Sequence, residues 1–386
     1  MCTDAPQDSI DGQGPRAGRR GSARPTHAEI DLSAIADNLR CLRRVASGAR
    51  IFAVIKADAY GHGLVPVARR LEAEGVDGLC VALAEEGFVL RDAHVRAPIL
   101  VLNGAYGSSH VEVLRAGLTP VIYDLAQAEA FARVASGARV NVHVKVDTGM
   151  ARLGVSLAQL EEFLSRLEAL TSLRIAGLMT HLSSADTDPS FTAGQLRLFE
   201  QAAEIVRVRG HRPTLLHAAN SAGTYASPAA HYDVVRPGLS LYGVSPIVGK
   251  GVDLRPAMRV RTEVLAVREL AAGAPVGYNQ AYHTTRPTRI ACVPIGYGDG
   301  YLRAASNRGH MLVGGLRCPI IGRIAMDLTT LDVTHVPTVA AGDEVVVLGS
   351  QGTEDLSAED LAAAADTIPY EVLCNISARV PRRYVS

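Results

Sequence analysis

The sequence predicts an α/β protein in which a (β/α)8, TIM-like barrel is followed by a mainly-β unit. From about residue 51, short β-branched runs alternate with stretches of helical period, a pattern typical of parallel α/β folds. After about residue 255, β-type runs are broken by Gly and Pro. We therefore expect a disordered tail over residues 1–25, a barrel over 26–255 and a C-terminal β domain over 256–386.

The number of strands favours a barrel. Eight candidate strands occur in series, separated by segments with room for helices, and eight is the strand count of a (β/α)8 barrel. An open, doubly wound sheet is the structural alternative. In order, the strands are IFAVIK (51–56), GLCVAL (78–83), PILVLN (98–103), TPVIYD (119–124), RVNVHVKV (139–146), LRIAGLMTH (173–181), TLLHA (214–218) and DVVRPG (233–238).

The C-terminal part is expected to be rich in strands and poor in helix. Its β-type segments are RTEVLAVREL, RIACVPIGYGDG, GHMLVGGLRCPIIGR and DEVVVLGS, with a single short helical stretch, SAEDLAAAAD. A long decoration of the barrel is the alternative to a separate domain.

Composition narrows the classes of ligand. The 386 residues include 39 Lys plus Arg and 39 Asp plus Glu, so no net field points to nucleic acid or to an anionic membrane. No apolar stretch approaches the roughly 18 residues of a membrane span. The six cysteines are scattered without metal-like spacing, which favours reduced core residues. We expect a small-molecule ligand, no metal and no membrane partner.

The N-terminal segment is rich in Gly, Pro, Ser and Arg and lacks the apolar region of a secretion signal. The Arg19-Arg20 pair is followed by polar residues, whereas a twin-arginine export signal requires apolar ones. We therefore expect a solvated tail and a cytoplasmic protein.

Chemistry in such barrels lies at the carboxyl ends of the strands. Lys56 ends the first apolar strand, where a buried ammonium is unstable unless it is paired or used covalently. A lysine held in this way can link to an aldehyde cofactor. Taken alone, a lysine at a strand end more often lies at the surface or in a salt bridge.

The segment VIKADAYGHG around Lys56 resembles the cofactor-lysine segment of the alanine racemase family, which are pyridoxal-phosphate-dependent enzymes of fold type III. Other segments resemble the same family in the same order, from about residue 27 to the end. They are HVKVDTGMARLG (143–154), GLMTHLSSAD (177–186), LHAANSAG (216–223), VRPGLSLYG (235–243), VPIGYGDGY (293–301), IGRIAMD (321–327) and TIPYEVLCNISARVPRRY (367–384).

The resemblance implies that the barrel binds pyridoxal phosphate. Ser221 and Gly238 follow candidate strands seven and eight, where barrels commonly bind phosphate, although Ser221 also fits a helix N-cap. Besides Lys56, the implied cofactor residues are Tyr60, His181, Asn220, Ser221, Arg236, Gly238 and Tyr370.

Arg236 resembles the arginine that faces the pyridine nitrogen of the cofactor. A guanidinium stays charged at ordinary pH, so as a donor it leaves that nitrogen unprotonated and weakens the ring as an electron sink. His181 resembles the residue that packs on the cofactor ring and bonds to this arginine, and it fits a core histidine equally well. No spacing supports a metal site of His62, His181 and His217.

Racemisation requires two opposed acid/base groups, because a proton leaves one face of the α-carbon and another arrives on the opposite face. The resemblance implies Lys56 for one face and Tyr278, in PVGYNQAY, for the other. A free phenol has a pKa of about 10, so Tyr278 needs positive charge nearby. Without the resemblance, Tyr278 fits a packing tyrosine. The two residues lie on different domains, and the family implies a homodimer with shared active sites.

The resemblance also implies a substrate pocket. Arg152 is a candidate for holding the substrate carboxylate, because its planar fork suits oxyanions. Met326 is a candidate for contributing its backbone N–H to the same carboxylate. Lys145 matches a lysine that many members carry as a carbamate, and an unmodified Lys145 paired with Asp147 is the alternative.

The expected activity is interconversion of L- and D-alanine, with D-alanine supplied to peptidoglycan synthesis. Tyr297 and Tyr370 would narrow the entrance to a side chain such as a methyl group. Ala325 and Leu328 replace a cysteine and a glutamine common in the family, and GYNQAY departs from the usual segment around the base. These departures put a strict preference for alanine in question.

Two other functions fit part of the sequence. A fold-related amino-acid decarboxylase would place an acidic residue at the pyridine nitrogen, where this chain has Arg236. A non-catalytic pyridoxal-phosphate carrier resembles the barrel alone, without the part that carries Tyr278 and Met326. Both are disfavoured for these reasons.

Overall fold

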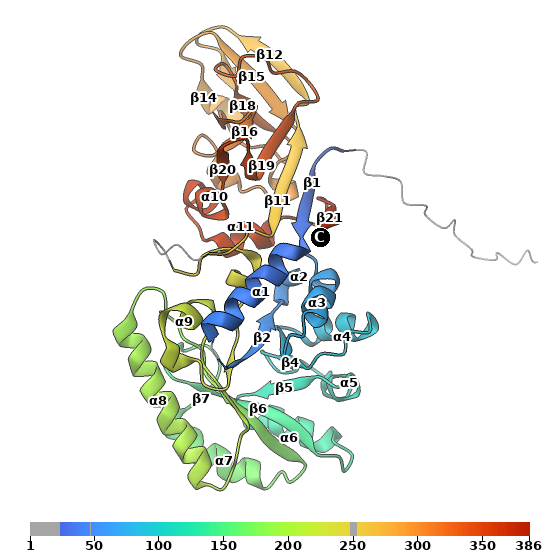
Figure 1. Cartoon of the computed structure of the whole chain (residues 1–386), viewed down its shortest axis with the longest axis vertical. Coiled ribbons are helices and arrows are strands. Elements are labelled where there is room, and N and C mark those ends of the chain that lie inside the picture. Colours follow the sequence, from blue (N-terminus) through green and yellow to red (C-terminus); the bar gives the residue numbers. More distant parts are fainter. Residues whose placement is uncertain (1–23, 47, 248–252) are drawn as a thin grey trace, which may run out of the picture.

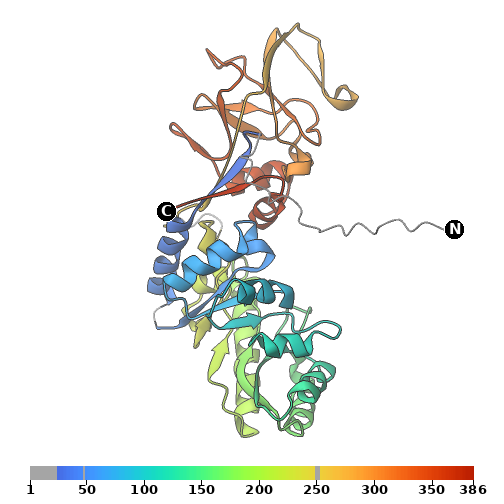
Figure 2. The same ribbon diagram turned by 90° about the vertical axis from the view of Figure 1, so that its right-hand side faces the viewer.

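The computed structural model describes residues 24–46, 48–247 and 253–386. Residues 1–23 of the expected tail lie outside this range. An α/β body occupies one end of the molecule and a sheet-rich body the other (Figures 1 and 2). The C-terminus lies where the two bodies meet in both views.

Eight parallel strands form the barrel, in the order β10-β2-β3-β4-β5-β6-β8-β9, and the short β7 (Val155–Ser156) pairs with β6. Backbone bonds from Asp233 to Leu216 (3.0 Å) and from Arg236 to Ala219 (2.9 Å) link the last two strands. The predicted barrel is confirmed and the open-sheet alternative is wrong. The strands are β2 (Arg50–Val54), β3 (Gly78–Val81), β4 (Ile99–Val101), β5 (Thr119–Ile122), β6 (Val140–Asp147), β8 (Leu173–Met179), β9 (Leu215–His217) and β10 (Val234–Val235).

Amphipathic helices cover the outside of the barrel, because strands buried on both faces need a second layer. In α7, for example, Leu160, Phe163, Leu164 and Leu167 share one buried face at helical spacing. The helices are α1 (Leu32–Ala46), α2 (Lys56–Tyr60), α3 (Leu64–Ala73), α4 (Ala84–Asp92), α5 (His110–Arg115), α6 (Leu125–Val134), α7 (Leu160–Glu168), α8 (Pro189–Val208) and α9 (Ser221–Ala226), with short 3-10 turns η1 (Leu157–Gln159), η2 (Pro228–Ala230) and η3 (Leu239–Tyr242).

The sheet-rich body contains one large sheet, ordered β17-β16-β19-β11-β1-β21 with β20 on β19, a three-stranded sheet β12-β15-β18 and the hairpin β13-β14. This confirms the mainly-β prediction. The strands are β11 (Met258–Glu263), β12 (Ala266–Leu270), β13 (Pro275–Val276), β14 (Tyr282–His283), β15 (Thr288–Val293), β16 (His310–Val313), β17 (Leu316–Pro319), β18 (Thr329–Asp332), β19 (Glu344–Gln351), β20 (Glu354–Leu356) and β21 (Arg382–Val385). The 3-10 turns are η4 (Tyr278–Gln280), η5 (Tyr297–Asp299) and η6 (Arg303–Ala305).

Helix content in this body exceeds the expectation of a single stretch. The expected helix is α10 (Ala358–Ala365), and a second, α11 (Pro369–Asn375), follows it. Pro369 stands at the start of α11, a position that proline favours. With seven residues, α11 is too short for its period to stand out in the sequence.

The first strand of the described residues lies in the large sheet and not in the barrel. Strand β1 (His27–Asp31) pairs antiparallel with β11 and parallel with β21, as its position beside them in Figure 1 shows. These residues lie within the range 26–255 that the sequence predicts as the barrel domain. Alternating burial reveals a strand here, but only the tertiary structure identifies its partners.

Two further observations concern partners and thiols. Within the described ranges, no helix has the length and apolar character needed to cross a membrane. Five cysteines are free thiols, and Cys2 lies outside the described residues.

Candidate active site

Lys56 lies at the carboxyl end of β2, but it begins α2 and does not end the strand as IFAVIK predicted. The four residues after it, 57–60, have φ of 53° or 54°, which is the left-handed region. This conformation costs roughly 1–2 kcal/mol for each residue other than glycine, so the surroundings must hold it. Glu86 accepts a hydrogen bond from the Ala57 N–H (2.6 Å), and Asp58 accepts one from the Leu64 N–H (2.7 Å).

Four cations converge at this end of the barrel: Lys56, Lys145, Arg152 and Arg236. Burial, together with the charges of Arg236 and Arg152, lowers the pKa of Lys145 to about 8. Burial also lowers the pKa of Lys56, with Arg152 as the next cause. Arg236 is only 3% exposed, and burial lowers its pKa to about 10. Such a concentration of positive charge, with Lys145 and Arg236 buried, suits an anionic ligand.

Lys145 occupies the fifth barrel strand, as expected, and its predicted alternative partner is engaged elsewhere. Asp147 Oδ1 accepts the backbone N–H groups of Gly149, Met150 and Ala151 at 2.9, 2.9 and 3.1 Å. No ion pair joins Lys145 to Asp147 in the described part of the chain. The Asp147 carboxylate therefore shapes the loop that leads to Arg152, whose side chain is exposed.

Arg236 is held by a chain of neutral histidines. Its guanidinium donates to His217 Nδ1 at 2.8 Å, and His217 Nε2 lies 2.8 Å from His143 Nδ1. Since a guanidinium can only donate, His217 carries its proton on Nε2 and donates it to His143. Burial lowers the pKa of His217 well below its usual value and that of His143 to about 4, so both rings are neutral.

This arrangement corrects one expectation. Arg236 bonds to His217, on the neighbouring strand β9, and to the carbonyls of Thr180 and Ala218, and not to His181. His181 is nevertheless close to the cations, because after burial the charges of Arg236 and Lys145 are the next causes that lower its pKa well below the usual range. No signal in the sequence pointed to His143.

The loops after β9 and β10 meet at Ser221. Its Oγ accepts the backbone N–H of Gly238 at 2.9 Å and that of Ser240 at 3.4 Å. The Ser240 Oγ is itself buried without a hydrogen-bond partner. The N-cap of α9 is Asn220, which accepts the Gly223 N–H at 2.9 Å, so the N-cap role considered for Ser221 is wrong. Ser221 instead joins the two loops through its hydrogen bonds with Gly238 and Ser240.

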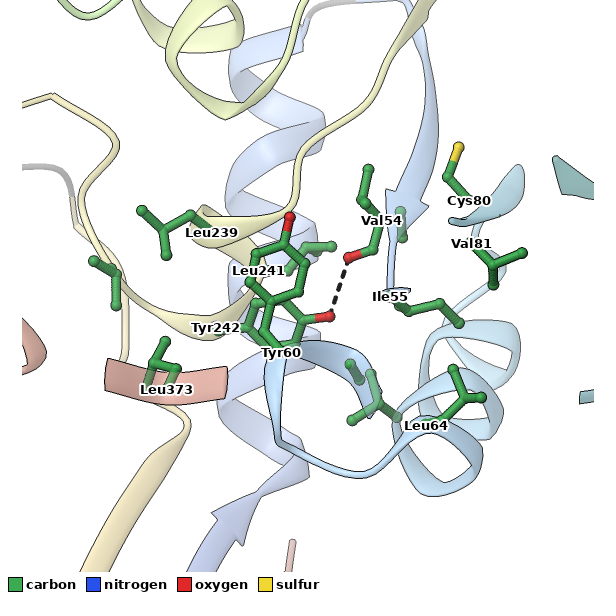
Figure 3. Close-up of a cluster of buried hydrophobic side chains, with 14 of the residues drawn as sticks. Val54, Ile55, Tyr60, Leu64, Cys80, Val81, Leu239, Leu241, Tyr242 and Leu373 are labelled. Carbon is green, nitrogen blue, oxygen red and sulfur yellow. Dashed lines mark hydrogen bonds between the residues drawn. The ribbon is translucent and has the colours of Figure 1, made fainter. Parts of the chain in front are cut away.

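The hydroxyl of Tyr60 lies close to Gly238, in the loop that Ser221 binds. A Cβ on residue 238 would lie 2.3 Å from the Tyr60 hydroxyl oxygen, so the approach requires glycine there. The ring of Tyr60 lies 4.8 Å from that of Tyr242, with Leu373 of the C-terminal part nearby in Figure 3, and 5.9 Å from that of Tyr370 on α11. Burial raises the pKa of Tyr60 and of Tyr370, so both phenols are neutral and can donate.

Three predicted site residues lie apart from this cluster. Tyr278 is 69% exposed in η4, and no hydrogen bond reaches its hydroxyl within the residues described. Figure 1 shows β14, which follows η4 closely, at the far end of the sheet-rich body from α2. Met326 is 51% exposed, and its loop joins that of Tyr297 through the bond from the Tyr297 N–H to the Ala325 carbonyl (3.0 Å).

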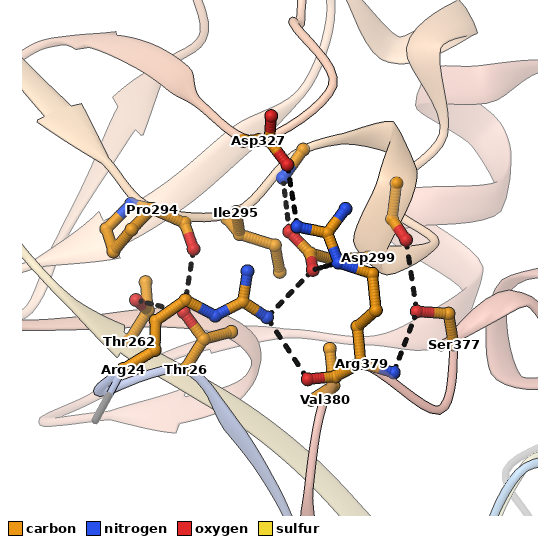
Figure 4. A network of polar contacts seen from close by, with 12 residues as sticks. Arg24, Thr26, Thr262, Pro294, Ile295, Asp299, Asp327, Ser377, Arg379 and Val380 are labelled. Carbon is orange, nitrogen blue, oxygen red and sulfur yellow. Dashed lines mark hydrogen bonds and ion pairs between the residues drawn. The ribbon is translucent and has the colours of Figure 1, made fainter. Parts of the chain in front are cut away.

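A buried carboxylate that the sequence analysis missed anchors the Tyr297 loop. Asp299 is fully buried, accepts from Arg24 at 2.8 Å and lies 3.5 Å from Arg379, which also binds Asp327 at 2.6 Å (Figure 4). Asp299 further accepts the Gly296 N–H at 3.0 Å. The turn residues of GYGDG were the only signal for this role.

The predicted residues thus fall into two groups. Lys56, Tyr60, Lys145, His181 and Arg236 gather in the barrel, and Tyr370 joins them from α11 of the same chain. His62 and His217 do not form a metal site with His181, and the described residues contain no cluster of His, Cys, Asp and Glu able to hold a metal. Fold and site together define a (β/α)8 barrel with a cluster of cationic side chains, Lys56 among them, at the carboxyl ends of its strands.

Comparison with known proteins agrees with this class. Residues 30–246 match the model of the alanine racemase N-terminal domain, and residues 257–384 match that of the C-terminal domain. A relative from Sorangium cellulosum, named alanine racemase, is 47% identical over 94% of this chain and 99% of its own length. Another, from Syntrophobacter fumaroxidans, is 44% identical over 90% of this chain and 94% of its own.

Solved structures agree as well. The alanine racemase of D-cycloserine-producing Streptomyces lavendulae superposes with a TM-score of 0.91 at 35% identity, covering 95% of this chain and 98% of that one. The biosynthetic alanine racemase of Pseudomonas aeruginosa gives 0.86 at 37% identity, covering 94% and 100%. The chain belongs to the alanine racemase family of isomerases.

Proposed function

We propose that this chain interconverts L- and D-alanine with pyridoxal phosphate as its cofactor, using Lys56 and Tyr278 as the two acid/base groups. The observation that carries the proposal is a lysine of lowered pKa among Lys145, Arg152 and Arg236 at the carboxyl ends of the barrel strands. Relatives named alanine racemase that align over nearly their whole length support the choice of substrate.

The residues at this end of the barrel fit the cofactor. A phosphate needs donors, and the loops joined at Ser221 offer the unpartnered buried hydroxyl of Ser240 and the neutral phenol of Tyr60. We propose that Ser221, Gly238, Tyr60 and Tyr370 hold the phosphate, with Asn220 supporting the loop. When bound, pyridoxal phosphate supplies an aldehyde that links to amines and a ring that withdraws electrons from the α-carbon.

Lys56 would link to the cofactor and, once released, hold or accept a proton at Nζ. Its lowered pKa supports this role, because a larger fraction of the amine is neutral near physiological pH. Arg152, on the exposed loop beyond Asp147, would bind the substrate carboxylate in a bidentate manner, and the Met326 N–H would assist.

Arg236 would face the pyridine nitrogen, with His181 packed on the ring. Held by His217 and by two carbonyls, the guanidinium cannot lose its proton and acts only as a donor. As a donor, Arg236 would leave the ring nitrogen of the cofactor unprotonated, and this would favour return of a proton over loss of carbon dioxide. A decarboxylase is accordingly disfavoured.

Tyr278 would act on the opposite face from a second copy of the chain. Its exposure, together with that of other large apolar side chains of the C-terminal part, supports a homodimer in which the β domain over 256–386 completes the partner's site. These exposed side chains include Tyr278, Tyr297, Met326, Leu328, Ile368 and Tyr370.

Lys145 would carry a carbamate. With a pKa of about 8, part of this amine is neutral near pH 7, and only a neutral amine adds carbon dioxide. The resulting anion would relieve repulsion among the cations and orient Arg152. A role in supplying D-alanine for peptidoglycan completes the proposal.

The experiment is the initial rate of racemisation of L-alanine, compared with L-serine and L-lysine, with pyridoxal phosphate added. We expect alanine to be converted fastest, because Tyr297 and Tyr370 narrow the entrance. Equal rates with serine or lysine would show that Ala325 and Leu328 have widened the pocket. No racemisation and no exchange of the α-hydrogen with solvent deuterium would overturn the proposal.

A further inference from the structure

We infer that His62 is a positioning residue for this reaction, because its imidazole holds the left-handed turn that follows Lys56. The turn, residues 57–60, joins the proposed cofactor lysine to Tyr60. The inference therefore rests on the proposed function, but it concerns how the lysine is aimed and not which substrate is used.

The hydrogen bonds of His62 are made to the turn itself. His62 is fully buried, and its Nδ1 lies 3.1 Å from the Ala59 carbonyl oxygen and 3.0 Å from that of Tyr60. Both partners can only accept, so Nδ1 carries a proton and donates it. One N–H thus binds two successive carbonyls of a turn whose backbone is otherwise unfavourable.

The ring of His62 connects the turn to the strand before Lys56. It stacks on Tyr242 with ring centroids 4.5 Å apart, and the Tyr242 hydroxyl donates to the Val54 carbonyl at 3.1 Å, as Figure 3 shows. Tyr242 also contacts the ring of Tyr60. His62 and Tyr242 therefore hold both ends of the segment that contains Lys56.

The C-terminal part closes the other side of the turn. Arg382 Nε donates to the Gly61 carbonyl at 3.0 Å, and a Cβ on residue 61 would lie 2.4 Å from the Leu373 carbonyl oxygen. Residue 61 has φ of 80°, so only glycine suits both the backbone and the contact. Arg382 and Leu373 thus contact the turn from the C-terminal part, and His62 binds two carbonyls within the turn.

An acid/base or metal-binding role fits His62 less well. Burial lowers its pKa to about 4, with the charge of Arg382 acting in the same direction, so the ring is neutral at physiological pH. Its Nε2 is buried and lacks a hydrogen-bond partner among the described residues. His62 thus acts through Lys56 and Tyr60 and not on the reacting atoms.

The test compares three variants of the full-length protein. His62→Asn places an amide N–H near the position of Nδ1, His62→Gln places the same group near Nε2, and His62→Phe keeps the stacking ring without a donor. Pyridoxal phosphate affinity is titrated by the visible absorbance of the Lys56-linked cofactor, and kcat, KM and the melting temperature are measured alongside.

We expect His62→Asn to stay within about threefold of the wild type in cofactor affinity and kcat. In His62→Gln and His62→Phe, we expect kcat to fall roughly 10²-fold with little change in KM, because the Lys56 amine is no longer held in its productive orientation. We expect cofactor affinity to fall about tenfold for the same reason. A packing role alone predicts the reverse order, with Phe best and Asn worst.

The inference is overturned if His62→Phe keeps wild-type cofactor affinity and kcat, or if His62→Asn falls as far as His62→Gln. Cofactor affinity does not depend on which amino acid is racemised. A wild-type protein that binds the cofactor but leaves alanine unchanged would therefore refute the proposed substrate while leaving the role of His62 measurable.

Discussion

The barrel and the C-terminal body contribute to the candidate site in opposite ways. Arg236, Lys145 and Ser221 in the barrel are buried, and hydrogen bonds tie Arg236 to His217 and Ser221 to Gly238. Tyr278 and Met326 in the C-terminal body are exposed in the single chain. Under the proposed function, folding of one chain would complete the half of the site that holds the cofactor, whereas Tyr278, the proposed second acid/base group, would need the surface of a second copy of the chain.

The strongest test of the barrel half is Lys56→Ala. We expect a fall in kcat of about 10⁴-fold or more, together with loss of the visible absorbance of the linked cofactor, because one residue provides both the linkage and a proton-transfer group. Racemisation assays and absorbance spectra check this. Retention of the absorbance would move the cofactor linkage to another amine.

The corresponding test of the C-terminal half is Tyr278→Phe. We expect the absorbance to persist and kcat to fall by about 10² to 10⁴, because only one proton-transfer group is lost. Tyr106→Phe, at a similarly exposed tyrosine in the barrel body, serves as the matched control and should be unchanged. Near-normal racemisation by the Tyr278 variant would contradict the two-base assignment.

Mixing the two inactive variants tests whether sites are shared. If Lys56 and Tyr278 come from different subunits, a hybrid dimer of Lys56→Ala and Tyr278→Phe chains has one intact site. Statistical reassociation then restores about a quarter of wild-type activity. Sites built within one chain would show no recovery in this assay.

The pH dependence of the free energy of unfolding tests whether Lys145 in the barrel is a destabilising buried cation. In buffer free of carbon dioxide, the pKa of Lys145 is about 8 in the folded chain against an ordinary value of 10.5. The unfolded chain therefore binds more protons between these values, and stability rises with pH across this window by about 3 kcal/mol.

Above pH 10.5 Lys145 causes no further rise in stability. Below pH 8 the buried charge of Lys145 lowers the free energy of unfolding by the full amount. Lys145→Met should lack that part of the rise in denaturant unfolding measured from pH 7 to 11. Identical profiles for the two proteins would show that Lys145 is not the strained cation.

The smallest expected effect concerns the Tyr297 loop. Asp299→Asn should lower the free energy of unfolding by about 2 kcal/mol, because a fully buried carboxylate loses its charge beside Arg24 and Arg379. Asp327→Asn, at a carboxylate that is 57% exposed on the same Arg379, should cost below about 1 kcal/mol. Equal losses in chemical denaturation would mean that burial is not the deciding factor.

Much of the fold and of the barrel half could be predicted from the sequence. Period-two and helical patterns identified the eight barrel strands, and the segment around Lys56 led to the reactive end of the barrel. Two other expectations from the sequence were wrong. Lys56 starts a left-handed turn, and Arg236 bonds to His217 in place of His181.

The sequence by itself determined the order of elements and the chemical character of each segment, because side-chain periodicity and turn residues are local properties. Only the tertiary structure decided that β1 joins the C-terminal sheet, that His62 ties the turn after Lys56, and that Lys145 has a lowered pKa. The pairing of β1 and the pKa of Lys145 depend on segments far apart in the chain, and the contacts of His62 depend on the left-handed turn and its burial against Tyr242, none of which a local pattern reveals.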